Sequence, residues 1–70
     1  MKYSFKVEVI VIDKNACETI EVSKTFNYLI NAYHAYLDEI EKRLRKEKAF
    51  IAIYKLFNDG SQEEYIHCEF

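Results

Sequence analysis

The sequence predicts an α+β domain in the order ββαββ, with a four-stranded, mainly antiparallel sheet and one long helix packed across one face. Three observations predict it. Apolar side chains alternate strictly at both ends of the chain, a helical spacing replaces the alternation in the middle, and turn-forming residues separate the strands. Because the 70 residues contain no linker, repeat or low-complexity stretch, we expect a single domain over residues 1–70.

The first hairpin is predicted within residues 3–25. One face of residues 3–12 is apolar throughout, whereas the other begins polar and ends in Ile10 and Ile12. This strand is therefore expected to be covered on both sides or to lie beneath a partner. After a turn at residues 13–15, the returning strand at 16–25 places Ile20 and Val22 on one face and is expected to be an edge strand.

The segment from about residue 26 to 47 is predicted to be the helix. A spacing of three and four defines an apolar stripe that is expected to face the core, formed by Phe26, Leu29, Ile30, Tyr33, Leu37, Ile40 and Leu44. Thr25 or Asn27 can cap the start. Two pairs spaced by four residues, Glu39–Arg43 and Glu41–Arg45, are expected to add roughly 0.2–0.5 kcal/mol each.

The second hairpin is predicted within residues 49–70. Residues 49–57 are apolar on both faces, and Gly60 in the turn at 58–61 can adopt the positive φ that a tight hairpin requires. The last strand is expected to place Ile66, Cys68 and Phe70 on one face. Its other face is a polar row that could bind a ligand, formed by Glu63, Tyr65, His67 and Glu69.

In its order of elements the whole chain resembles the small β-grasp proteins, such as immunoglobulin-binding domains, although no motif accompanies the resemblance. That resemblance implies parallel first and last strands, side by side at the centre of the sheet. The apolar residues on both faces of 49–57 favour instead a sheet with the third strand inside. Periodicity leaves both orders open.

Composition excludes several classes of protein. Half of the residues are hydrophobic, with six Tyr and five Phe, which is too rich for a disordered segment. A net charge of −2 argues against a broad nucleic-acid footprint. The longest apolar run, residues 9–12, cannot span a bilayer, and neither a signal peptide nor a dense disulfide framework is evident. We therefore expect a cytoplasmic protein without a membrane segment.

Catalytic and metal motifs are weak. The possible zinc ligands Cys17, His34, His67 and Cys68 are scattered, so no metal site and no cofactor are expected. His34 and Asp38 lie one helical turn apart and could form a general-base dyad, but an ordinary side-chain pair on a solvated flank is the favoured explanation. An enzyme, namely a small hydrolase or transferase, is the least supported class.

Binding is the predicted function. Two apolar surfaces exceed what one core requires: an open sheet face with Ile10, Ile12 and Tyr65, and a helix flank with Tyr28, Ala32 and Tyr36. We expect a homo-oligomer, a dimer or larger, that serves as a protein-interaction module and binds another protein as an accessory or inhibitor protein. In size and shape it is similar to many small phage-encoded accessory and inhibitor proteins.

The alternative is a nucleic-acid or nucleotide binder. Its candidate residues form the one basic run of the chain, together with nearby Tyr side chains: Lys42, Arg43, Arg45, Lys46 and Lys48. Glu41 and Glu47 interrupt this run, and basic residues at the end of a helix also have a structural reason, since they offset the negative end of the helix dipole.

Overall fold

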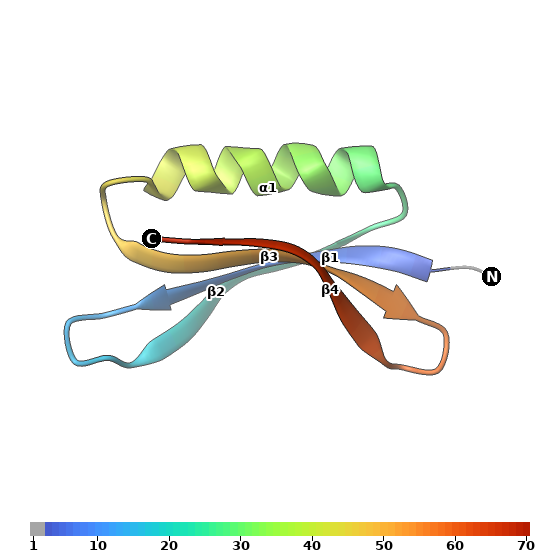
Figure 1. Ribbon diagram of the computed structural model, residues 1–70, viewed down its shortest axis with the longest axis horizontal. Coiled ribbons are helices and arrows are strands. Elements are labelled where there is room, and N and C mark those ends of the chain that lie inside the picture. The colour runs from blue at the N-terminus through green and yellow to red at the C-terminus, as the bar shows by residue number, and fades with distance from the viewer. Residues whose placement is uncertain (1–2) are drawn as a thin grey trace.

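The computed structural model describes residues 3–70 and confirms the ββαββ order (Figure 1). Its elements are β1 (Tyr3–Ile12), β2 (Glu18–Phe26), α1 (Leu29–Arg43), β3 (Lys48–Phe57) and β4 (Gln62–Glu69). The helix lies along one side of the sheet, and the turns of both hairpins curve away from it at opposite ends (Figure 1). The fold is thus two layers, a sheet and one helix.

The strand order is β2-β1-β3-β4, and every neighbouring pair is antiparallel. Of the two strand orders that periodicity leaves open, the structure has the one with β3 inside, as the two apolar faces of β3 favour. The parallel, central pair of first and last strands that a β-grasp resemblance implies is wrong, because β1 pairs with β2 and β3 while β4 is an edge strand. The edge position of β2 is also confirmed.

The core lies between α1 and the two central strands. Val7 is opposite Ile53 and Val9 is opposite Ile51 in the β1–β3 register, and all four side chains are fully buried. The helix contributes Ala32 and Tyr36 to this core, with Leu29, Ala35 and Ile40 packed around them. Large side chains on the sheet therefore meet a helix surface that is rich in alanine.

The face of the helix that was expected to be buried is largely exposed. Ile30 is 66% exposed and Leu37 is 47% exposed, and Tyr33 and Leu44 are similarly open. The predicted stripe is therefore wrong in orientation, although Leu29 and Ile40 at its margin do pack on the core. The face that packs on the sheet combines small and large side chains: Ala32 and Ala35 let the helix approach the β-branched residues of the sheet, and Tyr36 fills the space beside them.

Two irregularities in strand register change which side chains of the edge strands lie on the core side. Between Val9 and Ile10 the register skips Glu21, so Val22 pairs on the core side and Ile20 pairs on the opposite side. The expectation that Ile20 and Val22 share a face is therefore wrong. A second irregularity, between Ile53 and Tyr54, skips Tyr65 in β4. A residue inserted into one strand reverses the side on which the following side chains lie.

A few local residues shape the β3–β4 turn and the start of the helix. Gly60 adopts a φ of 89° in the β3–β4 turn, as predicted, and the backbone N–H and hydroxyl of Ser61 both donate to the Asp59 carboxylate. These two hydrogen bonds lower the pKa of Asp59. The helix begins after Tyr28, which makes no side-chain capping bond, so the predicted caps at Thr25 and Asn27 are wrong.

Arg43 connects the end of the helix to the edge strand β2 through an ion pair. Its guanidinium lies 3.1 Å from the Glu39 carboxylate, donates to Glu47 at 2.8 Å and lies 3.6 Å from Glu21 of β2. The Glu39–Arg43 pair is thus confirmed. The helix ends at Arg43, and Arg45 adopts a φ of 66°, so the predicted helical pair of Glu41 with Arg45 does not form among the described residues.

Candidate interaction surface

Exposed apolar side chains gather on one flank of the helix. Among residues 3–70, eight large apolar side chains are exposed, and five of them lie between residues 28 and 44. Four of these five form what we call the helix stripe: Ile30, Tyr33, Leu37 and Leu44. Contiguous exposed apolar surface of this kind is typical of sites where proteins associate.

The helix stripe continues onto β4. Ile30 and Tyr33 line a surface hollow together with Leu29 of the helix and with Tyr65 and Ile66 of β4. Tyr65 is 48% exposed, and its ring lies 6.4 Å from that of Phe5, a core residue. Tyr65 therefore belongs to the helix side of the sheet. We call the helix stripe together with Tyr65 the helix–β4 surface.

This placement corrects two sequence predictions. Tyr65 was expected on the open sheet face, but the register irregularity at Ile53 and Tyr54 turns it toward the helix side. The polar row of β4 is divided for the same reason: Glu64 takes the place expected for Glu63 and Tyr65, and its carboxylate lies 2.8 Å from Nδ1 of His67. The His67 ring stacks on Phe50, with ring centroids 5.0 Å apart.

Most residues predicted for the exposed helix flank are buried, whereas most residues of the predicted core stripe are exposed. Ala32 is fully buried and Tyr36 is 4% exposed, so neither can belong to a free flank. Burial raises the pKa of Tyr36, and the neighbouring Cys68 and Tyr33 raise it further. Only Tyr28 of that predicted set is exposed, and it precedes the helix.

The open sheet face, which is the face turned away from α1, is less apolar than expected. Ile10 and Ile12 are half-buried at one end of it. Its middle is occupied by Lys6, whose ammonium lies 3.3 Å from Glu8, donates to Gln62 at 3.0 Å and sits 5.2 Å from the centre of the Tyr54 ring. Charged and aromatic side chains therefore contact one another in the middle of this face, and its most exposed large apolar side chain is Ile20, which pairs with Ile10 at the edge.

The environment of Tyr54 makes a testable prediction. Burial raises the pKa of Tyr54 above the ordinary value of 10.0, and the Glu8 and Glu64 carboxylates raise it further. A raised pKa favours the neutral phenol in the folded state, so its contribution to stability is present below pH 10 and is lost as the pH rises through the folded pKa. We expect the phenolate absorbance of Tyr54, obtained as the difference between the wild type and Tyr54→Phe, to titrate above that value.

Glu8→Gln is the informative variant for this prediction. Removing the carboxylate charge is expected to lower the pKa of Tyr54 partway, since burial is the larger cause. Titration of Tyr54 at or below 10.0 in the wild type would contradict the described environment of its ring.

The basic run at the helix end is partly neutralised. Lys42 lies 3.3 Å from Asp38 and 3.7 Å from Glu39, and Arg43 is held by its three carboxylates. Arg45, Lys46 and Lys48 remain exposed. Two of the five candidate cations for nucleic acid are thus engaged within the fold, and no observation here favours the nucleic-acid alternative.

The candidate catalytic and metal residues do not come together. Asp38 pairs with Lys42, and no hydrogen bond joins it to His34 among the described residues. Cys17 is exposed next to the first turn, whereas Cys68 lies beside the core. Within residues 3–70, no group of three His, Cys, Asp or Glu side chains is arranged to hold a metal ion.

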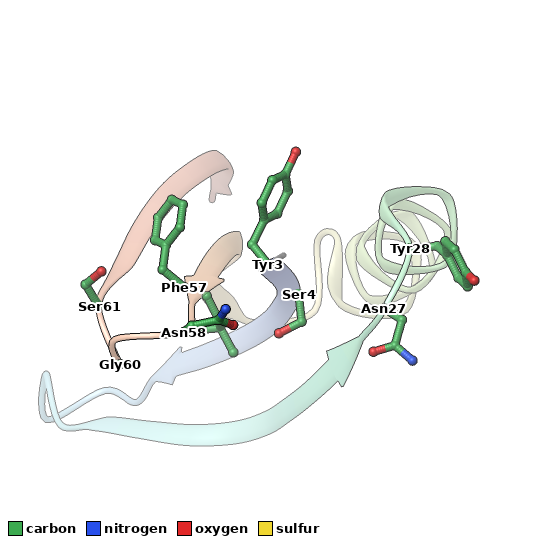
Figure 2. A pocket seen from close by; sticks show the side chains of 9 residues that line it. Tyr3, Ser4, Asn27, Tyr28, Phe57, Asn58, Gly60 and Ser61 are labelled. Carbon is green, nitrogen blue, oxygen red and sulfur yellow. The ribbon is translucent and has the colours of Figure 1, made fainter. Parts of the chain in front are cut away.

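A hollow at one end of the sheet is lined by neutral polar groups (Figure 2). Ser4 of β1, Asn27 of the β2–α1 connection and Asn58 and Ser61 of the β3–β4 turn contribute to it, while the Tyr28 ring points away from Tyr3 and Phe57 (Figure 2). The described residues that line it include no carboxylate, imidazole or thiol. The titratable side chains among the described residues that line it are the phenols of Tyr3 and Tyr28.

Comparisons with protein-family models, with curated proteins and with solved structures find no match for this chain. Over the part of the chain that the structure describes, no helix has both the length and the apolar character needed to cross a membrane. The arrangement of exposed side chains is therefore the basis for a functional proposal.

Proposed function

We propose that this protein is a non-enzymatic interaction module that binds protein partners through its helix–β4 surface. The observation that carries the proposal is the concentration of exposed apolar side chains along one flank of α1 and onto β4. Leaving Ile30 66% exposed and Leu37 47% exposed in water is unfavourable, and a protein partner would remove that cost. Tyr33 and Tyr65 are the kind of residue that interfaces favour.

The proposed binding surface lies on the helix side of the sheet, whereas the sequence predicts a binding surface on the open sheet face. Ile10 and Ile12 are already half-buried, and a network of charged and aromatic side chains occupies the middle of the open face. A role as an accessory or inhibitor protein requires only a rigid surface that another protein can recognise. The helix provides such rigidity because Arg43 anchors its C-terminal end to β2.

Site-specific photo-cross-linking tests the proposal. We expect p-benzoylphenylalanine in place of Tyr33 to capture a discrete protein partner in cells that carry the protein, because Tyr33 lies within the proposed surface. The same group in place of Phe50 is the matched control, since Phe50 lies on the open sheet face beside His67. The added change Leu37→Asp is expected to reduce capture from position 33 at least about tenfold.

The captured partner can be either a second copy of this chain or a different protein, and both outcomes support the proposed surface. Capture from position 50 but not from position 33 would place the function on the open sheet face. Capture from position 33 that Leu37→Asp leaves unchanged would show that the helix stripe does not contribute, and the proposal would be wrong.

A further inference from the structure

The helix stripe has the spacing of a helix–helix seam. Its members follow one another at intervals of three, four and seven residues, which is the a/d pattern of packed helices with one position left out. The omitted position belongs to Ile40, which packs against the core. From Ile30 to Leu44 the stripe extends about 21 Å along the helix axis, at about 1.5 Å per residue.

Three of the four members of the helix stripe are placed symmetrically about Leu37, whereas the position equivalent to Tyr33 is Glu41. Ile30 precedes Leu37 by seven residues, and Leu44 follows it by seven. If a second copy lies antiparallel with its Leu37 against this Leu37, then each Ile30 faces Leu44 of the other copy. A twofold axis requires a surface to be complementary to itself, and Ile30, Leu37 and Leu44 meet that requirement.

The polar residues beside the stripe are complementary in the same arrangement. His34 and Glu41 are both exposed and lie on the same side of the stripe, three residues before and four residues after Leu37. Neither makes a side-chain hydrogen bond or ion pair with the residues that the structure describes. An antiparallel second copy brings each His34 opposite the other copy's Glu41, where an imidazole N–H can donate to the carboxylate.

A parallel arrangement lacks these advantages. In a parallel pair the twofold axis runs along the helices, so the flank that carries His34 and Glu41 in one copy lies on the opposite side of the seam from the same flank of the other copy, and the two residues cannot pair. The dipoles of parallel helices would also point the same way, whereas antiparallel helices bring opposite ends together. Charge and dipole therefore both favour the antiparallel arrangement.

We propose that the occupant of the helix–β4 surface is a second copy of this chain, whose α1 packs antiparallel against the helix stripe and crosses it at Leu37. This inference rests on the proposed function, because it names the partner of the same surface. A domain of 70 residues buries only about 60% of the surface that its unfolded chain exposes, less than a larger domain does, and dimerisation adds to that burial. The exposed Tyr65 of each copy then lies beside the junction.

Cysteine cross-linking tests the arrangement. In a background with Cys17→Ser and Cys68→Ala, an equimolar mixture of Ile30→Cys and Leu44→Cys proteins is oxidised. We expect the mixed disulfide to exceed either self-disulfide at least about tenfold, because a disulfide needs Cα atoms within about 7 Å, and identical positions lie about 21 Å apart in the antiparallel pair. Self-disulfides as abundant as the mixed product would overturn the proposal.

A charge exchange provides a second test that keeps both native cysteines. His34→Glu is expected to weaken dimerisation about tenfold by placing carboxylates opposite one another, and the added change Glu41→His is expected to restore it. No weakening, or no restoration, would overturn the antiparallel arrangement. A monomeric wild type that still yields a cross-link from position 33 to a different protein would overturn this inference alone, while the proposed function would stand.

Discussion

Ile51→Ala is expected to cost about 2–5 kcal/mol of the free energy of unfolding. Ile51 is fully buried in the central strand β3, between Val9 of β1 and Cys68 of β4, so the shortened side chain leaves a cavity that its paired neighbours cannot fill. A small domain has roughly 5 kcal/mol of stability in total, so this one change should unfold a measurable fraction of the protein. Urea unfolding followed by circular dichroism at fixed protein concentration gives the value.

Ile20→Ala is the matched control for this change. It removes the same atoms from an isoleucine that is 60% exposed on the edge strand β2. Its expected cost is about 0.5 kcal/mol or less, as for most surface substitutions. Equal costs at the two positions would mean that the core does not lie between α1 and the β1–β3 pair.

Leu37→Asp is expected to have the largest effect on association. Leu37 is 47% exposed, so the substitution should leave the fold intact. In the proposed dimer it lies on the twofold axis, and both copies would bring a carboxylate into an apolar contact. A central interface residue contributes about 2 kcal/mol or more to the free energy of binding. Because both copies carry the substitution, this loss occurs twice, and we expect dimerisation to weaken at least about 100-fold.

The sequence predicts the sheet better than it predicts the helix surface. Apolar residues on both faces of 49–57 favour a central strand, and β3 is central, where neighbouring strands on both edges shelter its side chains more than a single neighbour would. The Gly60 turn is predicted for an equally local reason, since few other residues adopt its φ of 89°. Each of these signals lies within a short segment of the chain.

The orientation of the helix depends on the partner layer, which no short segment contains. Two sets of apolar residues follow the helical spacing with side chains of similar size, so spacing alone does not decide which set faces the core. The buried set is Leu29, Ala32, Tyr36 and Ile40, and the exposed set is Ile30, Tyr33 and Leu37. The sheet surface beneath the helix is filled by Ile51 and Ile53, and Ala32 and its neighbours face it. The small residues are the signal that could have revealed this orientation.

The predicted side-chain faces of the edge strands are wrong for another reason. A register irregularity reverses which side chains face the core, and the alternation of Ile20 and Val22 in β2 gives no sign of it. The same holds for Tyr65 in β4, whose position beside the helix follows from an irregularity in pairing with β3. These positions depend on cross-strand register, which a single strand does not encode.

The measurement that tests the proposed surface most directly is the solution mass by light scattering after size exclusion, across a dilution series, for three proteins. We expect the wild type and the double variant Ile10→Ser with Ile12→Ser to have twice the mass of the chain, and Leu37→Asp to have the mass of a single chain with an unchanged circular dichroism spectrum. A dimer that survives Leu37→Asp but is lost in the double variant would contradict the helix–β4 surface and return the interface to the open sheet face.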